Sequence, residues 1–340
     1  MKSKLFFALA YVFCNCMGVP FAYSEDIPEA QKPVTEQLVN TLTKLAGGPH
    51  SGYRSNHAKG VVLEGHFTPS KEAATITKAS HLQSIPSKVT VRFSDATGVP
   101  NIPDANGNAS PKGIAIRFNL PKGVSTDIVS ISSPVFPVAT PEDFLEMLNA
   151  VAMSGPDAPK PNALEKFLGS HPAAMKFVKT PKPAPVSFGN LAFYGLNAFK
   201  FTNAKGETHF GRYIISPVDG EKSLSAEDVA KAAPNYLMDE VVSHVNKNPI
   251  QFDLSVQLAQ AGDEVNDVTV SWPETRKIVQ LGVITIESAR VDSKEFEKTV
   301  MFNPLNLVNG IEPSNDPILL ARPAAYGVSY ARRLSNQSGK

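Results

Sequence analysis

Short strand-like runs, bounded by Gly, Pro, Asn and Asp, recur along most of this chain and limit the folds open to it. A first group spans 61–67, 89–94, 113–118 and 127–132, and a second spans 191–196, 198–202 and 209–216. Two further runs follow at 250–260 and 280–289. Many short strands with turn residues between them predict an antiparallel barrel or sandwich.

Helical patterns separate and close these strand groups. They cover 35–48, which stops at Gly47 and Gly48, and then 141–153, 162–178, 225–233, 236–245 and 319–334. No repeat of 20–50 residues is present. We predict an α+β fold: one domain with an antiparallel β-barrel or sandwich, helical insertions and a C-terminal helix.

The first 24 residues have the pattern of an export signal. Lys2 and Lys4 precede the apolar run "LFFALAYVF", and Ala22-Tyr23-Ser24 fits a small-x-small cleavage site. An uncleaved membrane anchor is the alternative, but the apolar run is short for a membrane span. The sequence therefore predicts a signal peptide at 1–24, a mature domain at 25–340, and a periplasmic or secreted protein that is free of the membrane.

Composition excludes several classes of function. Both cysteines, Cys14 and Cys16, lie in the predicted signal, so the mature chain has neither disulfides nor cysteine-bound zinc. Without Lys2 and Lys4, the 33 basic residues fall to 31 against 32 acidic ones. This balance gives no reason to expect a nucleic acid or an anionic membrane as partner.

Local catalytic motifs are also absent. The chain has no GxxxxGK[ST], GxGxxG after a strand, GxSxG or HExxH, and its seven histidines include no pair four residues apart. Any active site must therefore be assembled from dispersed residues.

The last helical stretch places Arg322, Tyr326, Tyr330 and Arg333 on one face, at i, i+4, i+8 and i+11. An exposed polar face is one interpretation. The other is that Tyr326 is a phenolate ligand to iron, because ferric iron and the nearby Arg322 guanidinium both favour the phenolate form.

The stretch "YRSNHAKGVVLEGHFTPS" places an Arg, a His and a Lys-Gly turn before an apolar strand. Taken alone, His57 is more often a core or turn histidine than a reactive group. Segments elsewhere change that balance. "RSNHAKG" and "ILLARPAAYGVSYARRL" resemble the distal-histidine and haem-ligand segments of haem catalases, with "VTVRFSDATG", "KGIAIRF", "DIVSISSPVFPVATPEDFLEML" and "NAFKFTNAKGE" in the same order between them.

The resemblance runs from about residue 50 to 335, and the short length, without the long arm and extra domain of large catalases, points to the catalase-related peroxidases. It implies a catalase-like antiparallel β-barrel with haem b as cofactor. His57 matches the distal histidine that moves a proton between the peroxide oxygens, and Ser94 matches the hydroxyl that orients it. Tyr326 matches the iron ligand and Arg322 the arginine that pairs with its phenolate.

Further matches concern the remainder of the cofactor. Arg54, Arg92 and Arg333 match arginines that bind the haem propionates. Phe136 and Phe144 match aromatic residues on the distal side. Each residue alone has an ordinary structural role as its alternative, and only the ordered combination indicates a site.

Three positions depart from the family pattern. Ile131 stands in place of the distal asparagine, and isoleucine cannot donate a hydrogen bond to peroxide. Asn56 stands where catalases usually have a valine in the access channel. Pro323 follows Arg322, which we expect to place it in the first turn of the helix.

The resemblance predicts an exported haem-dependent peroxidase that reduces hydrogen peroxide or organic hydroperoxides with a small organic electron donor. The absent distal asparagine predicts weak or no catalase activity. The alternatives are a catalase proper, a converter of organic hydroperoxides, and a non-enzymatic haem carrier. The sequence sets neither the donor nor the number of subunits.

Overall fold

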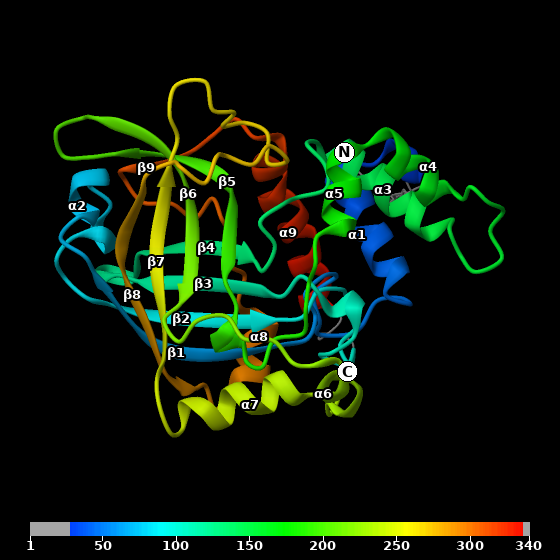
Figure 1. Cartoon of the computed structure of the whole chain (residues 1–340), viewed down its shortest axis with the longest axis horizontal. Helices are drawn as coiled ribbons and strands as arrows, with labels where there is room; N and C mark the ends of the chain where they lie inside the picture. The colour runs from blue at the N-terminus through cyan, green and yellow to red at the C-terminus, as the bar shows by residue number, and fades with distance from the viewer. Residues whose placement is uncertain (1–27, 336–340) are drawn as a thin grey trace, which may run out of the picture. The chain divides into compact units, whose positions relative to one another are not determined.

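The strands of the computed structural model close into an antiparallel barrel (Figure 1). The order is β4-β3-β2-β1-β8-β7-β6-β5, and a pairing of Ile131 with Tyr194 joins β4 to β5 and completes the ring. A ninth strand, β9, pairs with β5. The bounds are β1 Gly60–Pro69, β2 Ser87–Ser94, β3 Gly113–Asn119, β4 Ser125–Ile131, β5 Phe193–Thr202, β6 Thr208–Pro217, β7 Ile250–Leu258, β8 Ile278–Ala289 and β9 Ile311–Pro313. The predicted barrel is therefore confirmed.

The barrel interior is filled by large apolar side chains. Phe93, Phe188, Phe193 and Phe252 are fully buried, and the rings of Phe93 and Phe188 stack at 4.9 Å. Closing the sheet through the β4–β5 pairing surrounds one large apolar cluster, and a smaller one that includes Val138, Phe167 and Ile318 lies apart from it.

The runs predicted as separate strands at 191–196 and 198–202 form the single strand β5. Its pairing register with β6 shifts between Gly195 and Phe199, which marks a bulge in the strand. A bulge turns side chains away from the regular alternation, and this one contains Asn197.

The structure describes residues 28–335. The described residues fall into two units, 28–32, which holds the 3-10 helix η1 Glu29–Gln31, and 33–335. The predicted signal peptide at 1–24 lies outside the described residues and stays a prediction, as does the domain boundary at residue 25. Within 28–335, no helix combines the length and apolar character needed to cross a membrane.

Helices gather beside the barrel within the second unit. Figure 1 shows α1, α3, α4 and α5 together on one side, with α9 between them and the barrel, while α6 and α7 cover another region. The bounds are α1 Val34–Leu45, α2 Ala73–Ile76, α3 Pro141–Ala152, α4 Ala163–Ser170, α5 Pro172–Lys179, α6 Ala226–Lys231, α7 Tyr236–Val245, α8 Ser293–Thr299 and α9 Pro317–Ser335.

The C-terminal helix α9 begins earlier than the sequence analysis placed it. Asp316 accepts hydrogen bonds from Ile318 N (2.9 Å) and Leu319 N (3.3 Å), and Pro317 occupies the first helical position. The expectation that Pro323 lies in the first turn is therefore wrong. Pro323 is inside the helix, where it lacks the N–H that would bond to the Leu319 carbonyl.

His81 makes the fold sensitive to acid. Its ring is buried against Phe118 and its Nδ1 has no partner among the described residues. Burial lowers the pKa of His81 to about 3. Below pH 6.5 the unfolded chain therefore binds a proton that the native state rejects, which costs about 2 kcal/mol at pH 5. We expect His81→Leu to reduce the loss of unfolding free energy between pH 7 and pH 5 by this amount, measured by urea denaturation.

The exposed His209 provides the matched control. Substitution of His209 by leucine should leave the difference between pH 7 and pH 5 unchanged, because its ring meets water in both states. Equal pH dependence in wild type and His81→Leu would contradict the assignment.

Candidate active site

His57 lies in the loop before β1 and has a φ of 53°, which places a non-glycine residue in the left-handed region. Its Nδ1 hydrogen-bonds with Ser94 Oγ at 3.1 Å. Ser94 ends β2 opposite Gly113 of β3, and a Cβ on Gly113 would lie 2.7 Å from Ser94 Oγ and 2.9 Å from His57 Nδ1. Only glycine at 113 leaves room for this pair. Backbone strain of this kind collects at functional sites.

A buried charge cluster fixes the loop that carries His57. Lys59 Nζ bonds to Asp104 at 2.5 Å and donates to the carbonyls of Ile102 and Pro234. Lys112 Nζ bonds to Asp95, the residue after Ser94, at 2.5 Å. One buried ion pair therefore begins two residues after His57 and another begins one residue after Ser94, so the backbone on both sides of the hydrogen-bonded pair is fixed.

The imidazole of His57 is held in its neutral form. Burial, followed by the positive charge of Arg92, lowers the pKa of His57 to about 3. The ring is therefore unprotonated at physiological pH, which is the state from which a general base starts.

A chain of polar groups leads from Tyr326 into the protein. Arg322 Nε donates to Tyr326 Oη at 3.0 Å, and Arg322 Nη1 donates to Asn197 Oδ1 at 2.9 Å. Asn197 Nδ2 donates in turn to Asp316 Oδ2 at 2.9 Å. Asp316 is fully buried at the start of α9, so the orientation of Arg322 is tied to the cap of the helix that carries Tyr326.

Arg54, Arg92 and Arg333 come together at the other end of the site. Arg54 Nη1 and Arg92 Nη2 donate to the same Glu297 oxygen, at 3.2 and 2.9 Å. Arg54 and Arg333 both donate to the Val300 carbonyl, at 3.1 and 2.7 Å. Burial, followed by mutual repulsion, lowers the pKa of Arg54, and burial with the charge of Arg92 lowers that of Arg333 to about 10.

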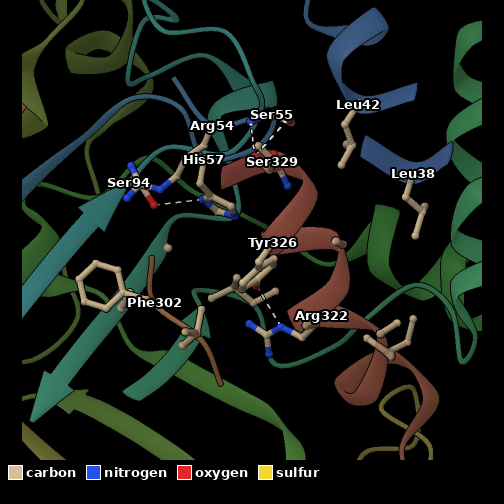
Figure 2. A pocket seen from close by; sticks show the side chains of 18 of the residues that line it. Leu38, Leu42, Arg54, Ser55, His57, Ser94, Phe302, Arg322, Tyr326 and Ser329 are labelled. Atoms are coloured by element: carbon tan, nitrogen blue, oxygen red, sulfur yellow. Dashed lines mark hydrogen bonds between the residues drawn. The ribbon is translucent and has the colours of Figure 1, made fainter. Parts of the chain in front are cut away.

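These groups line a single cavity of about 300 Å³, here called the inner cavity. In Figure 2 the His57 ring, bonded to Ser94, and the Tyr326 ring, bonded to Arg322, face the same space. The walls between are largely apolar and include Leu38, Val39, Leu42, Ile114, Val129, Ile131, Phe136, Phe144, Phe302 and Ile318.

The structure brings together all the residues that the sequence singled out. The cavity is lined by His57, Ser94, Arg54, Arg92, Phe136, Phe144, Arg322, Tyr326 and Arg333. Phe136 and Phe144 contact each other with ring centroids 5.8 Å apart. Asn56 and Ile131 also line the cavity, so two of the three departures from the expected pattern concern its wall.

The residues present fit a haem. Its apolar macrocycle suits the aliphatic and aromatic walls, and its two propionates suit a cluster of three guanidiniums that holds one carboxylate, Glu297. Arg92 Nε is buried without a partner among the described residues, which leaves a donor for a further acceptor. Tyr326 Oη would supply an oxygen ligand to the haem iron.

Comparison with known proteins agrees with this geometry. The family model described as Catalase matches residues 51–339. The chain belongs to the catalase family. It is 34% identical over 88% of its length to a catalase-related peroxidase of Synechococcus elongatus, of which the match covers 89%. It is 32% identical over 89% of its length to a catalase-related peroxidase of Mycolicibacterium paratuberculosis, of which the match covers 96%.

The fold of this catalase-family chain is also that of solved catalases. A fungal catalase superimposes with a TM-score of 0.75 at 21% identity over 87% of this chain. The chain spans 62% of the length of that protein. At this identity the likeness concerns the fold, and it confirms the catalase-like barrel.

The sequence analysis missed several residues of the site. Glu297 lies in the charged run of α8 and has no pattern that points to the arginines. Asn197 lies in a segment quoted for its resemblance, but only the bulge of β5 shows that it faces Arg322. Asp316 before Pro317 carries a helix-start pattern that could have been recognised.

Glu297 offsets part of the positive charge of the three arginines through its ion pairs with Arg54 and Arg92. Replacing it by glutamine leaves Arg92, which is 4% exposed at its side chain, without a charge partner. Loss of one partner of a buried pair is expected to cost about 3 kcal/mol of unfolding free energy in the haem-free protein. Urea denaturation measures this, and loading with haem should reduce the loss because the propionates replace the missing charge.

Glu295→Gln is the control for this variant. Glu295 lies on the same helix, but its side chain is 73% exposed and pairs with Lys298 at the surface. Its loss should cost about 0.5 kcal/mol or less. Equal destabilisation by the two substitutions would show that Glu297 has no special relation to the arginine cluster.

Proposed function

We propose that this chain is an exported haem b peroxidase that reduces hydrogen peroxide or organic hydroperoxides with electrons from a small organic donor. The observation that carries the proposal is that a neutral imidazole with a fixed partner and an arginine-bonded phenol face the same cavity, which ends in three arginines. The relatives named catalase-related peroxidase support an oxidoreductase that acts on peroxide. Export rests on the signal-like pattern of residues 1–24 and predicts a periplasmic or secreted location.

Tyr326, Arg54, Arg92 and Arg333 would hold the haem, with Phe136 and Phe144 against its macrocycle. When bound, haem supplies the iron that exchanges electrons with peroxide and donor. Arg322 would stabilise the phenolate form of Tyr326 by its hydrogen bond.

His57 provides the proton chemistry. Its Nδ1 is occupied by Ser94, so the other ring nitrogen is the one able to exchange protons with a ligand. The neutral ring takes a proton from one peroxide oxygen and returns it to the other, which leaves as water or alcohol. The surrounding apolar walls exclude bulk water and suit the carbon chain of an organic hydroperoxide.

Ile131 favours peroxidase over catalase chemistry. Dismutation requires a second peroxide to bind beside His57, and a lost preorganised donor costs about 10²–10³ in rate where it acts on the transition state. Ser130, the neighbour of Ile131, has a buried hydroxyl without a partner among the described residues. Ser130 also lines the inner cavity, and its hydroxyl lies on the β5 side of the wall, 3.4 Å from the position that a Cβ on Gly195 would take.

The experiment that tests this function compares two products of hydrogen peroxide in the haem-loaded protein. We expect peroxide-driven oxidation of a dye to exceed oxygen release, and we expect Ile131→Asn to raise oxygen release by about tenfold. Ile131→Leu is the control because it keeps the wall apolar. Rapid oxygen release by wild type would instead indicate a catalase, and a stable haem spectrum with no reaction toward peroxide would indicate a carrier.

A further inference from the structure

A second cavity, here called the outer pocket, adjoins the arginine end of the inner cavity. Its volume is about 270 Å³, and it lies between the end of α1, the loop before His57 and the last turns of α9. Arg54, Ser55, Ser329 and Arg333 line both cavities. These four residues form the wall between the two cavities, and two of them, Arg54 and Arg333, belong to the arginine cluster that would hold the propionates.

The outer pocket is rich in hydrogen-bond donors and cationic groups. Arg332 and the half-exposed Tyr53 line it beside the shared residues. Thr43 and His50 also line it, but their side chains donate to the Val39 and Ala46 carbonyls, at 2.7 and 3.0 Å. No aspartate or glutamate belongs to the described lining. A concave site with convergent donors and no carboxylate selects an anionic or hydroxyl-bearing ligand.

Arg332 is the cation that remains for such a ligand. The two propionates and Glu297 would together balance Arg54, Arg92 and Arg333. Arg332 has its Nη2 3.6 Å from Glu36, and both side chains are about one third exposed. A surface pair of this kind contributes little and can open toward a better-placed anion.

The wall that the two cavities share contains a short polar connection. Ser329 Oγ accepts hydrogen bonds from Ser55 N at 3.1 Å and from Ser55 Oγ at 3.2 Å, and both are drawn in Figure 2. Electrons can cross such a wall to the edge of a cofactor without the donor entering the inner cavity. The His57 side would then stay available for peroxide.

We propose that the outer pocket binds the electron donor, and that this donor is a small organic anion with oxidisable hydroxyl groups. The inference rests on the proposed function and adds the class and place of its second substrate. The reaction balances: the donor AH₂ becomes A and gives up two electrons and two protons. One ROOH takes these up and becomes ROH and water.

Ascorbate is the probe, because it is a small monoanion with ene-diol hydroxyls. Calorimetric titration into the haem-loaded protein without peroxide should give one saturable site. Arg332→Gln should weaken binding by about tenfold through loss of a charge-assisted contact. Lys71→Gln, which removes an exposed charge far from the pocket in sequence, should leave the affinity unchanged. Thr43→Phe should fill the pocket and also weaken binding.

Binding and activity separate this inference from the proposed function. Equal ascorbate affinity in wild type, Arg332→Gln and Thr43→Phe would overturn the outer pocket as the donor site, even if dye oxidation by peroxide continued. Saturable binding that both variants weaken would support the site, even if no donor were oxidised and the peroxidase proposal failed.

Discussion

Replacing Tyr326 by phenylalanine is expected to abolish tight haem binding. The substitution removes the phenol oxygen that would hold the iron and leaves Arg322 Nε without its acceptor, while the ring and its packing remain. Loss of an outer-shell partner lowers metal affinity by about 10–100-fold, and loss of the ligand itself should exceed this. The measurement is titration of haem into the haem-free protein, followed by the visible absorption spectrum.

Tyr236→Phe is the matched control for this result. It also removes a hydrogen-bonded phenol oxygen, since Tyr236 Oη donates to the Pro185 carbonyl, but Tyr236 does not line the cavity. Its haem affinity and spectrum should equal those of wild type. Unchanged affinity and an unchanged spectrum in Tyr326→Phe would show that the iron is held by another residue.

The strand pattern predicted an antiparallel barrel or sandwich and the resemblance to catalases selected the barrel, but neither predicted its local irregularities. The alternating runs identified the strands because one face of each must be buried. The break at Asn197 suggested two strands, whereas pairing with β6 carries the chain through as one bulged strand. Pro323 was misplaced because proline commonly occupies the first turn of a helix. The cap by Asp316 and tertiary packing instead start α9 at Pro317, six residues before Pro323.

The candidate site was predictable where chemistry and order along the chain combined. The spacing from Arg322 to Arg333 fixed one helix face, and His57 became credible only with the ordered segments that resemble catalases. Glu297 could not be predicted, because its contact with Arg54 and Arg92 depends on where α8 packs. The outer pocket likewise depends on how α1 and α9 meet the loop before His57.

Replacing His57 by asparagine is expected to slow the reaction with peroxide by about 10²–10⁴-fold while haem remains bound. Asparagine tolerates the left-handed backbone of residue 57, so it is a safer replacement than alanine at this φ. It cannot take up and return a proton. Rapid mixing with peroxide, followed at the Soret band, measures the rate, and His209→Asn at the protein surface is the control.

The pH dependence separates a catalytic role of His57 from a structural one. A histidine with an ordinary pKa near 6.5 would lose its base form as the pH falls from 8 to 5. The pKa of His57 is lowered to about 3 by burial and the charge of Arg92, so the wild-type rate should stay level over this range and fall only toward pH 3.

Ser94→Ala, which removes the partner of Nδ1, should reduce the rate without removing the haem spectrum. A wild-type rate that halves near pH 6.5, or one that His57→Asn leaves unchanged, would assign the proton transfer to another group.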